Sequence, residues 1–166
     1  MSAAPWRGAL PDPSQTEALG ATLARTLPSA TEGPLVVYLE GELGAGKTTL
    51  ARGFLRALGV ASPVRSPTYT LVECYELDRL VCVHLDLYRL SSAAELETLG
   101  VRELAADGYV WLIEWPERAA GPGLPAADIE IRLWTESAAH AFQAEPRTAR
   151  GVAWLDAAVA RSRATP

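Results

Sequence analysis

Short apolar runs along the chain predict the strands of a buried sheet. Residues 35–39 and 109–113 are continuously apolar and rich in valine, leucine, isoleucine and aromatic side chains, which is typical of strands covered on both faces. Segments 70–77 and 80–87 are also strand-like, with only a few residues between them. Because this connection is too short for a parallel crossover, the two segments are expected to form an antiparallel hairpin.

Apolar residues at helical spacing predict helices between and around these strands. Ser14 with Glu17, and Ser92 with Glu95, have the form of capping boxes, which begin helices. Gly59 is positioned to end one of them. The predicted helices cover residues 14–27, 49–58, 92–106 and 151–163.

The remaining segments are predicted as loops and exposed strands. Residues 1–13 carry several prolines and are expected to be an irregular lead-in, and residues 116–125 a loop with at most one helical turn. Residues 129–134 alternate with a period of two, as an exposed strand does, and residues around 141–145 could pair with them. The alternation of strands and helices predicts a single α/β domain over residues 1–166, with a mixed sheet.

Composition narrows the class of protein without identifying it. The chain has 166 residues, of which 49% are hydrophobic and 21% charged, so it can build a core without metals or disulfides. No apolar run approaches the roughly 18 residues of a membrane helix, and the first residues lack the pattern of a secretion signal, which favours a cytoplasmic protein. The net charge of −5 argues against unaided capture of nucleic acid.

The cysteines are too few for a disulfide framework. If the hairpin turn is centred on Asp78, Cys74 faces Cys82, and we expect two reduced, buried thiols there. His84 would share their face, but no third ligand has the spacing of a metal site, so no zinc is expected.

Lys47 is the only lysine among the 15 basic residues, and all the others are arginine. A single lysine indicates a position that needs a compact, mobile ammonium rather than a planar guanidinium. It lies in residues 41–48, which match the pattern G-x-x-x-x-G-K-[ST] between an apolar strand and a helical segment. The sequence therefore predicts a phosphate-binding loop.

The residue types of this loop suit a nucleotide. Gly41, Gly44 and Gly46 permit positive φ and close approach to phosphate, and N–H groups at the helix N-terminus then converge on the anion. Lys47 can reach the β- and γ-phosphates, and the Thr48 hydroxyl can bind Mg²⁺. The expected nucleotide contacts are Glu42, Leu43, Gly44, Ala45, Gly46, Lys47, Thr48 and Thr49.

Two carboxylates, Asp86 and Glu114, directly follow apolar strand-like runs. Ligands of open α/β sheets gather at the carboxyl ends of strands, and a carboxylate there is costly to desolvate unless a cation meets it. We expect one of them to hold Mg²⁺ through water and the other to bind it or to orient the attacking water.

Residues 66–70 offer three hydroxyls and an aromatic ring ahead of the hairpin. With the hairpin turn at Asp78, Thr70 pairs with Asp86, which would bring this segment beside the metal site. Tyr88 and Trp115 follow the two acidic strand ends and either pack in the core, which is the default, or line the nucleotide pocket or a partner surface. His140 is expected in a loop.

The sequence excludes one class of nucleotide-binding protein and leaves three others open. A GTPase is excluded because the chain has no asparagine and no second lysine for the guanine-reading Asn-Lys-x-Asp motif. An accessory ATPase, a small-molecule kinase and a nucleotide-dependent binding module with negligible turnover remain. Arg102, Arg118 and Arg132 are scattered and form no evident kinase lid.

Four motifs together resemble the TsaE (YjeE) family, the small bacterial ATPases of tRNA threonylcarbamoyladenosine biosynthesis. The resemblance covers about Leu10 to Leu133, whereas residues past Trp134 resemble little. The motifs are residues 41–49, 66–73, 84–89 and 113–116.

The resemblance implies a P-loop NTPase-like three-layer α/β sandwich with a mainly parallel mixed sheet. It implies ATP binding and slow hydrolysis in support of a modification beside the anticodon of tRNAs that read codons beginning with A, together with the partners TsaD and TsaB. Lys47, Thr48 and Thr49 would contact phosphates or Mg²⁺, and Glu114 would be a metal ligand. Asp86 would be the Walker-B-like carboxylate, and Thr68 would sense the γ-phosphate.

Overall fold

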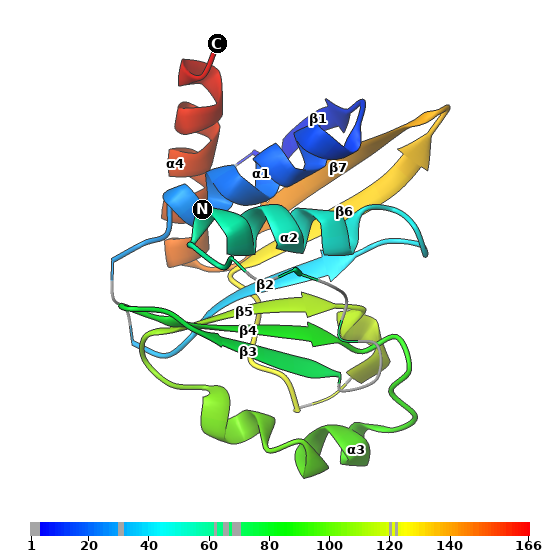
Figure 1. The fold of residues 1–166 in the computed structure, drawn as a ribbon, viewed down its shortest axis with the longest axis vertical. Helices are drawn as coiled ribbons and strands as arrows, with labels where there is room; N and C mark the ends of the chain where they lie inside the picture. The colour runs from blue at the N-terminus through cyan, green and yellow to red at the C-terminus, as the bar shows by residue number, and fades with distance from the viewer. Residues whose placement is uncertain are drawn as a thin grey trace.

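The computed structural model describes residues 4–29, 32–61, 63–64, 67, 71–119, 121 and 123–166. Its centre is a seven-stranded sheet in the order β1-β7-β6-β2-β5-β4-β3 (Figure 1). The strands are β1 (Trp6–Leu10), β2 (Leu35–Glu40), β3 (Val72–Glu76), β4 (Val81–Asp86), β5 (Tyr109–Glu114), β6 (Ile129–Glu136) and β7 (Ala139–Pro146).

The sheet is mixed, as the sequence predicts, but it is not mainly parallel. The pairs β2–β5, β2–β6 and β4–β5 are parallel, and the pairs β1–β7, β3–β4 and β6–β7 are antiparallel. The central strands are therefore parallel, and both flanks are antiparallel additions. The expected pairing of the segment around 141–145 with the strand from Ile129 is confirmed by β6 and β7.

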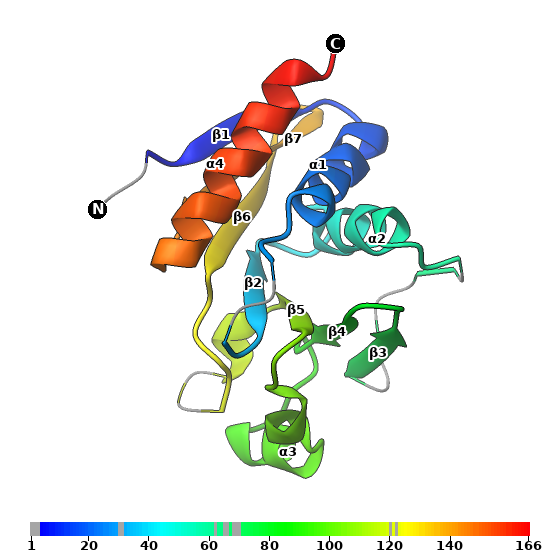
Figure 2. The ribbon, with the colours of Figure 1, turned by 90° about the vertical axis from the view of Figure 1, so that its left-hand side faces the viewer.

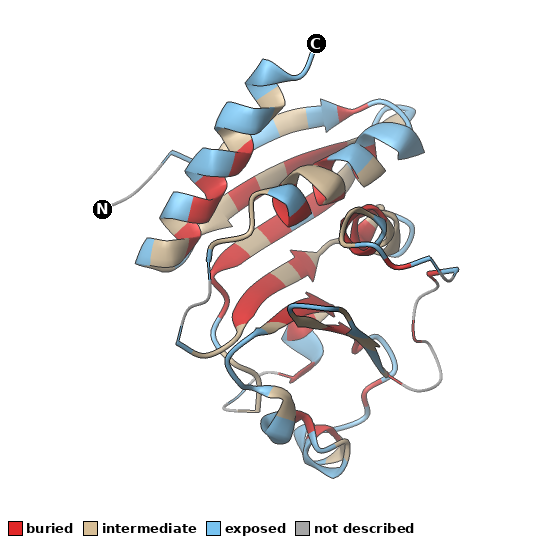
Figure 3. Ribbon diagram, turned by 60° about the vertical axis from the view of Figure 1, so that its left-hand side comes forward, coloured by how far each residue is buried: buried red, intermediate tan, exposed pale blue. Residues whose placement is uncertain are grey.

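Helices cover the two faces of the sheet unequally (Figure 2). One face packs against α1 (Pro13–Arg25), α2 (Lys47–Ala57) and α4 (Ala149–Ala164). The other carries α3 (Ala93–Thr98) and two 3₁₀ helices, η1 (Val101–Leu104) and η2 (Pro116–Ala119), over β4 and β5. The core accordingly has two parts, and the buried residues concentrate on the sheet and on the helix faces turned to it (Figure 3). No described helix has the length and apolar character that crossing a membrane requires.

The N-terminal segment differs from the expected irregular lead-in, because residues 6–10 form the edge strand β1 on β7. Helix α1 begins one residue before the expected Ser14. Its N-cap is Asp12, whose side chain accepts a hydrogen bond from Gln15 N at 3.0 Å. Pro13, which suits the first helical turn, follows this cap directly.

The helix predicted to run from Ser92 to about Ala106 is shorter than expected. Helix α3 ends at Thr98, and Gly100, with φ of 68°, separates it from η1. A glycine in the left-handed region ends a helix, and the apolar spacing that suggested one long helix continues across this break.

The hairpin register differs from the predicted one by a single residue. Cys74 is opposite Val83, and Tyr75 is opposite Cys82. Successive side chains of a strand point to opposite faces, so this shift separates the two thiols. Cys82 is buried, as expected, whereas Cys74 is exposed.

Two glycines bring α1 against α2, the helix that begins at the phosphate loop. A β-carbon added at Gly20 would lie 2.1 Å from Leu50 O, and one at Gly53 would lie 2.1 Å from Glu17 O. Both distances are far below a normal contact, so the helix backbones approach to a separation that only glycine allows. Helix α1 thereby supports the first turns of α2.

The C-terminal part of the chain is joined to the central sheet by a buried carboxylate. Asp128 is fully buried, and its side chain accepts hydrogen bonds from Val36 N at 2.9 Å, Thr148 Oγ1 at 2.6 Å and Arg150 Nε at 2.7 Å. Thr148 is also the N-cap of α4. Asp128 therefore ties the starts of β6 and α4 to β2.

Candidate phosphate-binding site

The phosphate loop predicted at residues 41–48 connects the end of β2 to the start of α2. Gly41, Gly44 and Gly46 have φ values of 148°, 80° and 107°, which side chains with a β-carbon rarely adopt. Gly41 is also confined by its surroundings, because a β-carbon there would lie 2.3 Å from Leu133 O. The loop therefore needs glycine for its conformation and for its contact with β6.

Lys47 lies over this loop with its side chain buried. It is 4% exposed, and its Nζ donates hydrogen bonds to Gly41 O at 2.5 Å and to Glu42 O at 2.9 Å. Burial lowers the pKa of this ammonium below that of an ordinary lysine, and the carboxylates of Glu114 and then Asp86 partly offset the effect. A desolvated cation at a helix N-terminus is suited to a multiply charged anion.

The two carboxylates predicted at strand ends do end strands β4 and β5, and they lie side by side. Asp86 is the register partner of Glu114 at the ends of β4 and β5, and they are 8% and 2% exposed. The Thr48 hydroxyl donates to Glu114 Oε1 at 2.8 Å, and His84 Nε2 lies 2.7 Å from Glu114 Oε2. Asp86 Oδ1 accepts a hydrogen bond from Tyr88 N at 3.1 Å.

The donor set at this point fits Mg²⁺. Thr48 offers a hydroxyl oxygen next to one carboxylate, and Asp86 offers a second carboxylate on the neighbouring strand. Mg²⁺ prefers oxygen ligands, and proteins usually hold it with one or two carboxylates together with substrate phosphates. Among the described residues no cluster of three or more His, Cys, Asp or Glu side chains could hold a metal ion, so oxygens from the nucleotide or from water would complete its coordination.

Two aromatic residues, Tyr88 and Trp115, line the site. Trp115 also packs, partly buried, against the core over β4 and β5, as the default expectation has it, whereas Tyr88 is exposed. The Lys47 ammonium lies 4.2 Å from the ring centroid of Trp115, and Tyr88 packs on Trp115 with 5.0 Å between the ring centroids. Trp115 has φ of 59°, a strained conformation for a bulky residue. The backbone N–H of Trp115 donates to Leu39 O at 3.2 Å, which helps to hold this conformation.

A cavity of about 410 Å³ contains most of these groups. It also includes Arg89 and His140, which the sequence analysis did not assign to a site. His140 lies in β7 rather than in a loop, and its Nδ1 is 3.4 Å from where a β-carbon on Gly46 would be. The lining residues are Leu43, Gly44, Gly46, Lys47, Thr48, Thr49, Asp86, Tyr88, Arg89, Glu114, Trp115 and His140.

Not every predicted site residue lines this cavity. Glu42 contributes its carbonyl to Lys47, and the Ala45 side chain is buried at 1% exposure. Thr68 lies outside the described residues, as do Ser66 and Thr70. Leu71, the first described residue after them, accepts a hydrogen bond from Asp86 N at 3.0 Å.

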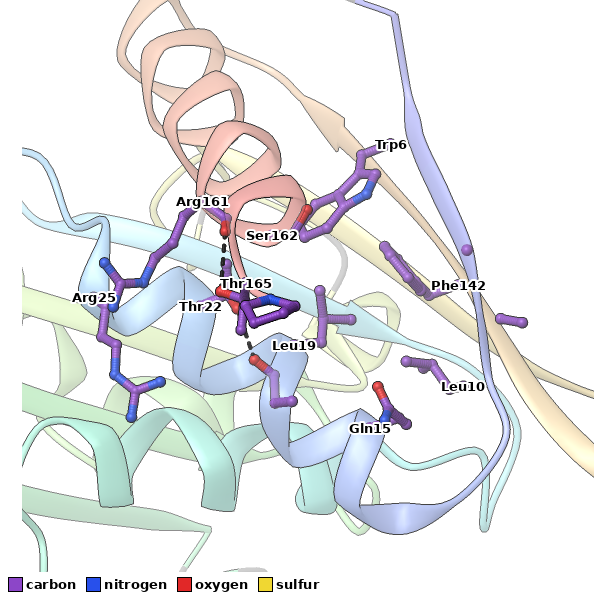
Figure 4. A pocket seen from close by; sticks show the side chains of 14 residues that line it. Trp6, Leu10, Gln15, Leu19, Thr22, Arg25, Phe142, Arg161, Ser162 and Thr165 are labelled. Carbon is purple, nitrogen blue, oxygen red and sulfur yellow. Dashed lines mark hydrogen bonds between the residues drawn. The ribbon is translucent and has the colours of Figure 1, made fainter.

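A second cavity, of about 500 Å³, lies between α1, α4 and the outer strands β1 and β7. Trp6, Leu10, Leu19 and Phe142 form its apolar part (Figure 4). No Asp, Glu, Cys or His lines it, and its glycine belongs to β1 rather than to a loop that begins a helix. The groups suited to bind phosphate and a divalent cation are therefore concentrated in the cavity of about 410 Å³.

The parallel centre of the sheet and the loop that joins β2 to α2 define a P-loop protein. The Thr48 hydroxyl and the two strand-end carboxylates lie next to this loop.

Comparison with known proteins identifies the family within this class. The family model described as threonylcarbamoyl adenosine biosynthesis protein TsaE matches residues 10–143. The chain belongs to the TsaE family.

Individual relatives agree with this assignment. The tRNA threonylcarbamoyladenosine biosynthesis protein TsaE of Haemophilus influenzae is 48% identical over 103 residues, which cover 62% of this chain and 65% of the relative. The TsaE protein of a Synechocystis species is 39% identical over 126 residues, 70% of this chain and 73% of the relative. The crystal structure of Bacillus subtilis YdiB superposes with a TM-score of 0.78 over 98% of both chains at 24% identity, which supports the fold.

Proposed function

We propose that this protein binds and slowly hydrolyses ATP in support of threonylcarbamoyladenosine formation in tRNA. The modified nucleoside would be the adenosine beside the anticodon in tRNAs that read codons beginning with A. The observation that carries the proposal is the direct hydrogen bond, 2.8 Å long, between the Thr48 hydroxyl and Glu114 next to the buried Lys47. The family membership supplies the pathway.

The residues of the site would share the work of phosphate binding. The backbone N–H groups of Lys47, Thr48 and Thr49 belong to the first turn of α2, where they have no partner within the helix. They and the Lys47 ammonium would bind the β- and γ-phosphates, and the ammonium would exchange its loop carbonyl partners for phosphate oxygens. Negative charge that develops during hydrolysis would be stabilised by the same groups.

The two carboxylates would act on Mg²⁺ and on the attacking water. Thr48 and Glu114 would hold Mg²⁺, which when bound neutralises phosphate charge. Asp86 would act as the Walker-B-like carboxylate and orient the attacking water. Thr68 would belong to a segment that senses the γ-phosphate.

The partners would be proteins rather than tRNA alone. Family resemblance suggests TsaD and TsaB, with tRNA engaged through the complex and the protein acting in the cytoplasm. The net charge of −5 supports this proposal, because an acidic chain gains no general electrostatic attraction to a polyanion.

Phosphate release from ATP tests the proposal, measured with Mg²⁺ and with or without TsaD and TsaB. We expect slow release that the partners change, and loss of release in Glu114→Ala. Transfer of labelled γ-phosphate to a small metabolite instead of water would establish a kinase and overturn the proposal. ATP binding without hydrolysis under all conditions would reduce the protein to a binding module.

The cellular role is tested by mass spectrometry of tRNA nucleosides after depletion of the protein. Threonylcarbamoyladenosine should fall, and expression of the wild type but not of Lys47→Ala should restore it. Normal levels of the modified nucleoside in the depleted cells would contradict the assignment to this pathway.

A further inference from the structure

His84 is a buried titratable residue that has no part in the chemistry described above. It lies in β4 and is 0% exposed. Because side chains alternate along a strand, it shares the face of Cys82 and Asp86, which is turned toward α2. Leu112 is its register partner on β5. An apolar side chain would be the ordinary choice at this position.

The hydrogen bonds of His84 define the arrangement of its ring. Nε2 lies 2.7 Å from Glu114 Oε2, whereas Nδ1 is buried and has no hydrogen-bond partner among the described residues. A buried N–H without an acceptor is costly and rare. The ring therefore carries its proton on Nε2 and donates it to Glu114, and the proton-free Nδ1 faces the core.

The hydrogen bond from His84 helps to fix the orientation of the Glu114 carboxylate. His84 holds Oε2, and the Thr48 hydroxyl donates to Oε1 at 2.8 Å. With Oε2 engaged in the interior, Oε1 is the oxygen turned to the phosphate loop. Without His84, a carboxylate that is 2% exposed would lose one of these two donors and the constraint on its rotation.

We propose that His84 is a positioning residue that orients Glu114 so that Oε1, beside the Thr48 hydroxyl, is presented to Mg²⁺. The inference rests on the proposed function, since it concerns the metal that accompanies ATP. Residues that hydrogen-bond a metal ligand from behind commonly change metal affinity by about 10- to 100-fold when they are replaced. A residue that only fills the core would change stability and leave the metal dependence unaltered.

Two polar replacements of similar size separate these roles. In His84→Gln the side-chain amide reaches about as far as Nε2 and can still donate to Glu114, whereas the shorter side chain of His84→Asn cannot. Cys82→Ala is the matched control, because Cys82 is also fully buried on the same face of β4 and has no part in the site.

The measurement is the affinity of the purified chain for a fluorescent ATP analogue as free Mg²⁺ is varied, with a parallel titration in EDTA. We expect His84→Asn to raise the Mg²⁺ concentration for half-saturation about tenfold or more, while analogue binding in EDTA stays at the wild-type value. His84→Gln should restore most of the loss, and Cys82→Ala should match the wild type.

The outcomes distinguish this inference from the proposed function. Unchanged Mg²⁺ dependence in His84→Asn overturns the role of His84 alone. No analogue binding by the wild type overturns the proposed function and this inference with it. If His84→Asn does not fold, ¹⁵N NMR of the wild-type ring decides: a proton on Nε2 and a response of its signal to Mg²⁺ in the presence of ATP support the role, and a proton on Nδ1 contradicts it.

Discussion

Gly20 makes one of the two close contacts between α1 and α2 described above, and Gly20→Ala tests whether this contact supports the phosphate site. Two opposing effects are expected. Alanine is favoured over glycine within a helix by about 1 kcal/mol. Its β-carbon, however, would lie 2.1 Å from Leu50 O and 2.8 Å from Phe54 N, both backbone atoms of α2.

The steric effect should exceed the gain in helix propensity. To bring the contact with Leu50 O to an ordinary 3.4 Å, the helices must separate by about 1.3 Å. Overpacking of this kind typically costs 1–3 kcal/mol, and backbone atoms cannot rotate away, so we expect a value near the upper end and a net loss of about 2 kcal/mol. For a chain of this length that corresponds to a fall in Tm of about 4–8 °C.

Separation of the two helices should also disturb the phosphate site, because Leu50 lies in the first turns of α2, close to Lys47 and Thr48 in the chain. A displacement of about 1 Å can slow catalysis about 100-fold. The assays are thermal unfolding, which gives the Tm, and phosphate release measured well below it. Ala21→Gly, at the neighbouring position of α1, is the control, and should lose about 1 kcal/mol with normal phosphate release. A rise in Tm for Gly20→Ala would refute the close-contact argument.

Three further predictions concern stability, thiol reactivity and pH. Asp128→Ala should lower the free energy of unfolding by about 3–5 kcal/mol, because it breaks a buried, hydrogen-bonded charge pair; a loss below 1 kcal/mol in urea unfolding would contradict the role of Asp128. Iodoacetamide should label Cys74 slowly and leave Cys82 unmodified in the folded protein, since burial raises the pKa of both thiols and Cys82 is inaccessible; mass spectrometry showing both labelled would contradict the structure. ATP affinity should begin to fall at a pH below the ordinary lysine pKa of 10.5, because burial lowers the pKa of Lys47 and only its protonated form attracts phosphate. Between the lowered pKa of Lys47 in the folded protein and the value of 10.5 in the unfolded chain, the unfolded chain holds a proton that the folded chain has lost. The contribution of Lys47 to the unfolding free energy of the ligand-free protein should therefore rise with pH in this range. An ATP affinity that stays constant up to pH 10.5 would contradict the Lys47 assignment.

The centre of the fold could be predicted because its signals are local. The apolar runs that form β4 and β5 end at Asp86 and Glu114, so both carboxylates could be assigned to strand ends before the pairing of the strands was known. The phosphate loop could be predicted equally well, because Gly46 and Lys47 belong to a pattern whose conformation and chemistry follow from the residue types.

The features that could not be predicted depend on contacts distant in sequence. Strand β1 gains its partner β7 more than 130 residues later in the chain, and Pro5 and Pro11 on either side of it suggested a loop. The hairpin is a local exception. Its turn is centred between Asp78 and Arg79, with Leu77 N donating to Leu80 O at 2.9 Å, so a turn centred on Asp78 gives a register that is wrong by one residue.

Site residues supplied by distant strands were missed for the same reason. His140 reaches the loop only through the pairing of β7 with β6. The bond from His84 to Glu114 requires the alignment of β4 with β5. The sequence did hold one signal for His84: it is two residues before Asp86 in the same strand, so both side chains lie on one face.

The proposed function depends above all on the Lys47 ammonium, which would bind the phosphates of ATP beside the glycine loop. Calorimetric titration of ATP with Mg²⁺ into the wild type and Lys47→Ala tests it most directly, with thermal unfolding as the check that both chains are folded. We expect clear binding by the wild type and a loss of affinity of about 10- to 100-fold in the variant, the usual effect of removing a hydrogen bond to a charged group. Equal affinities in two folded chains would contradict it.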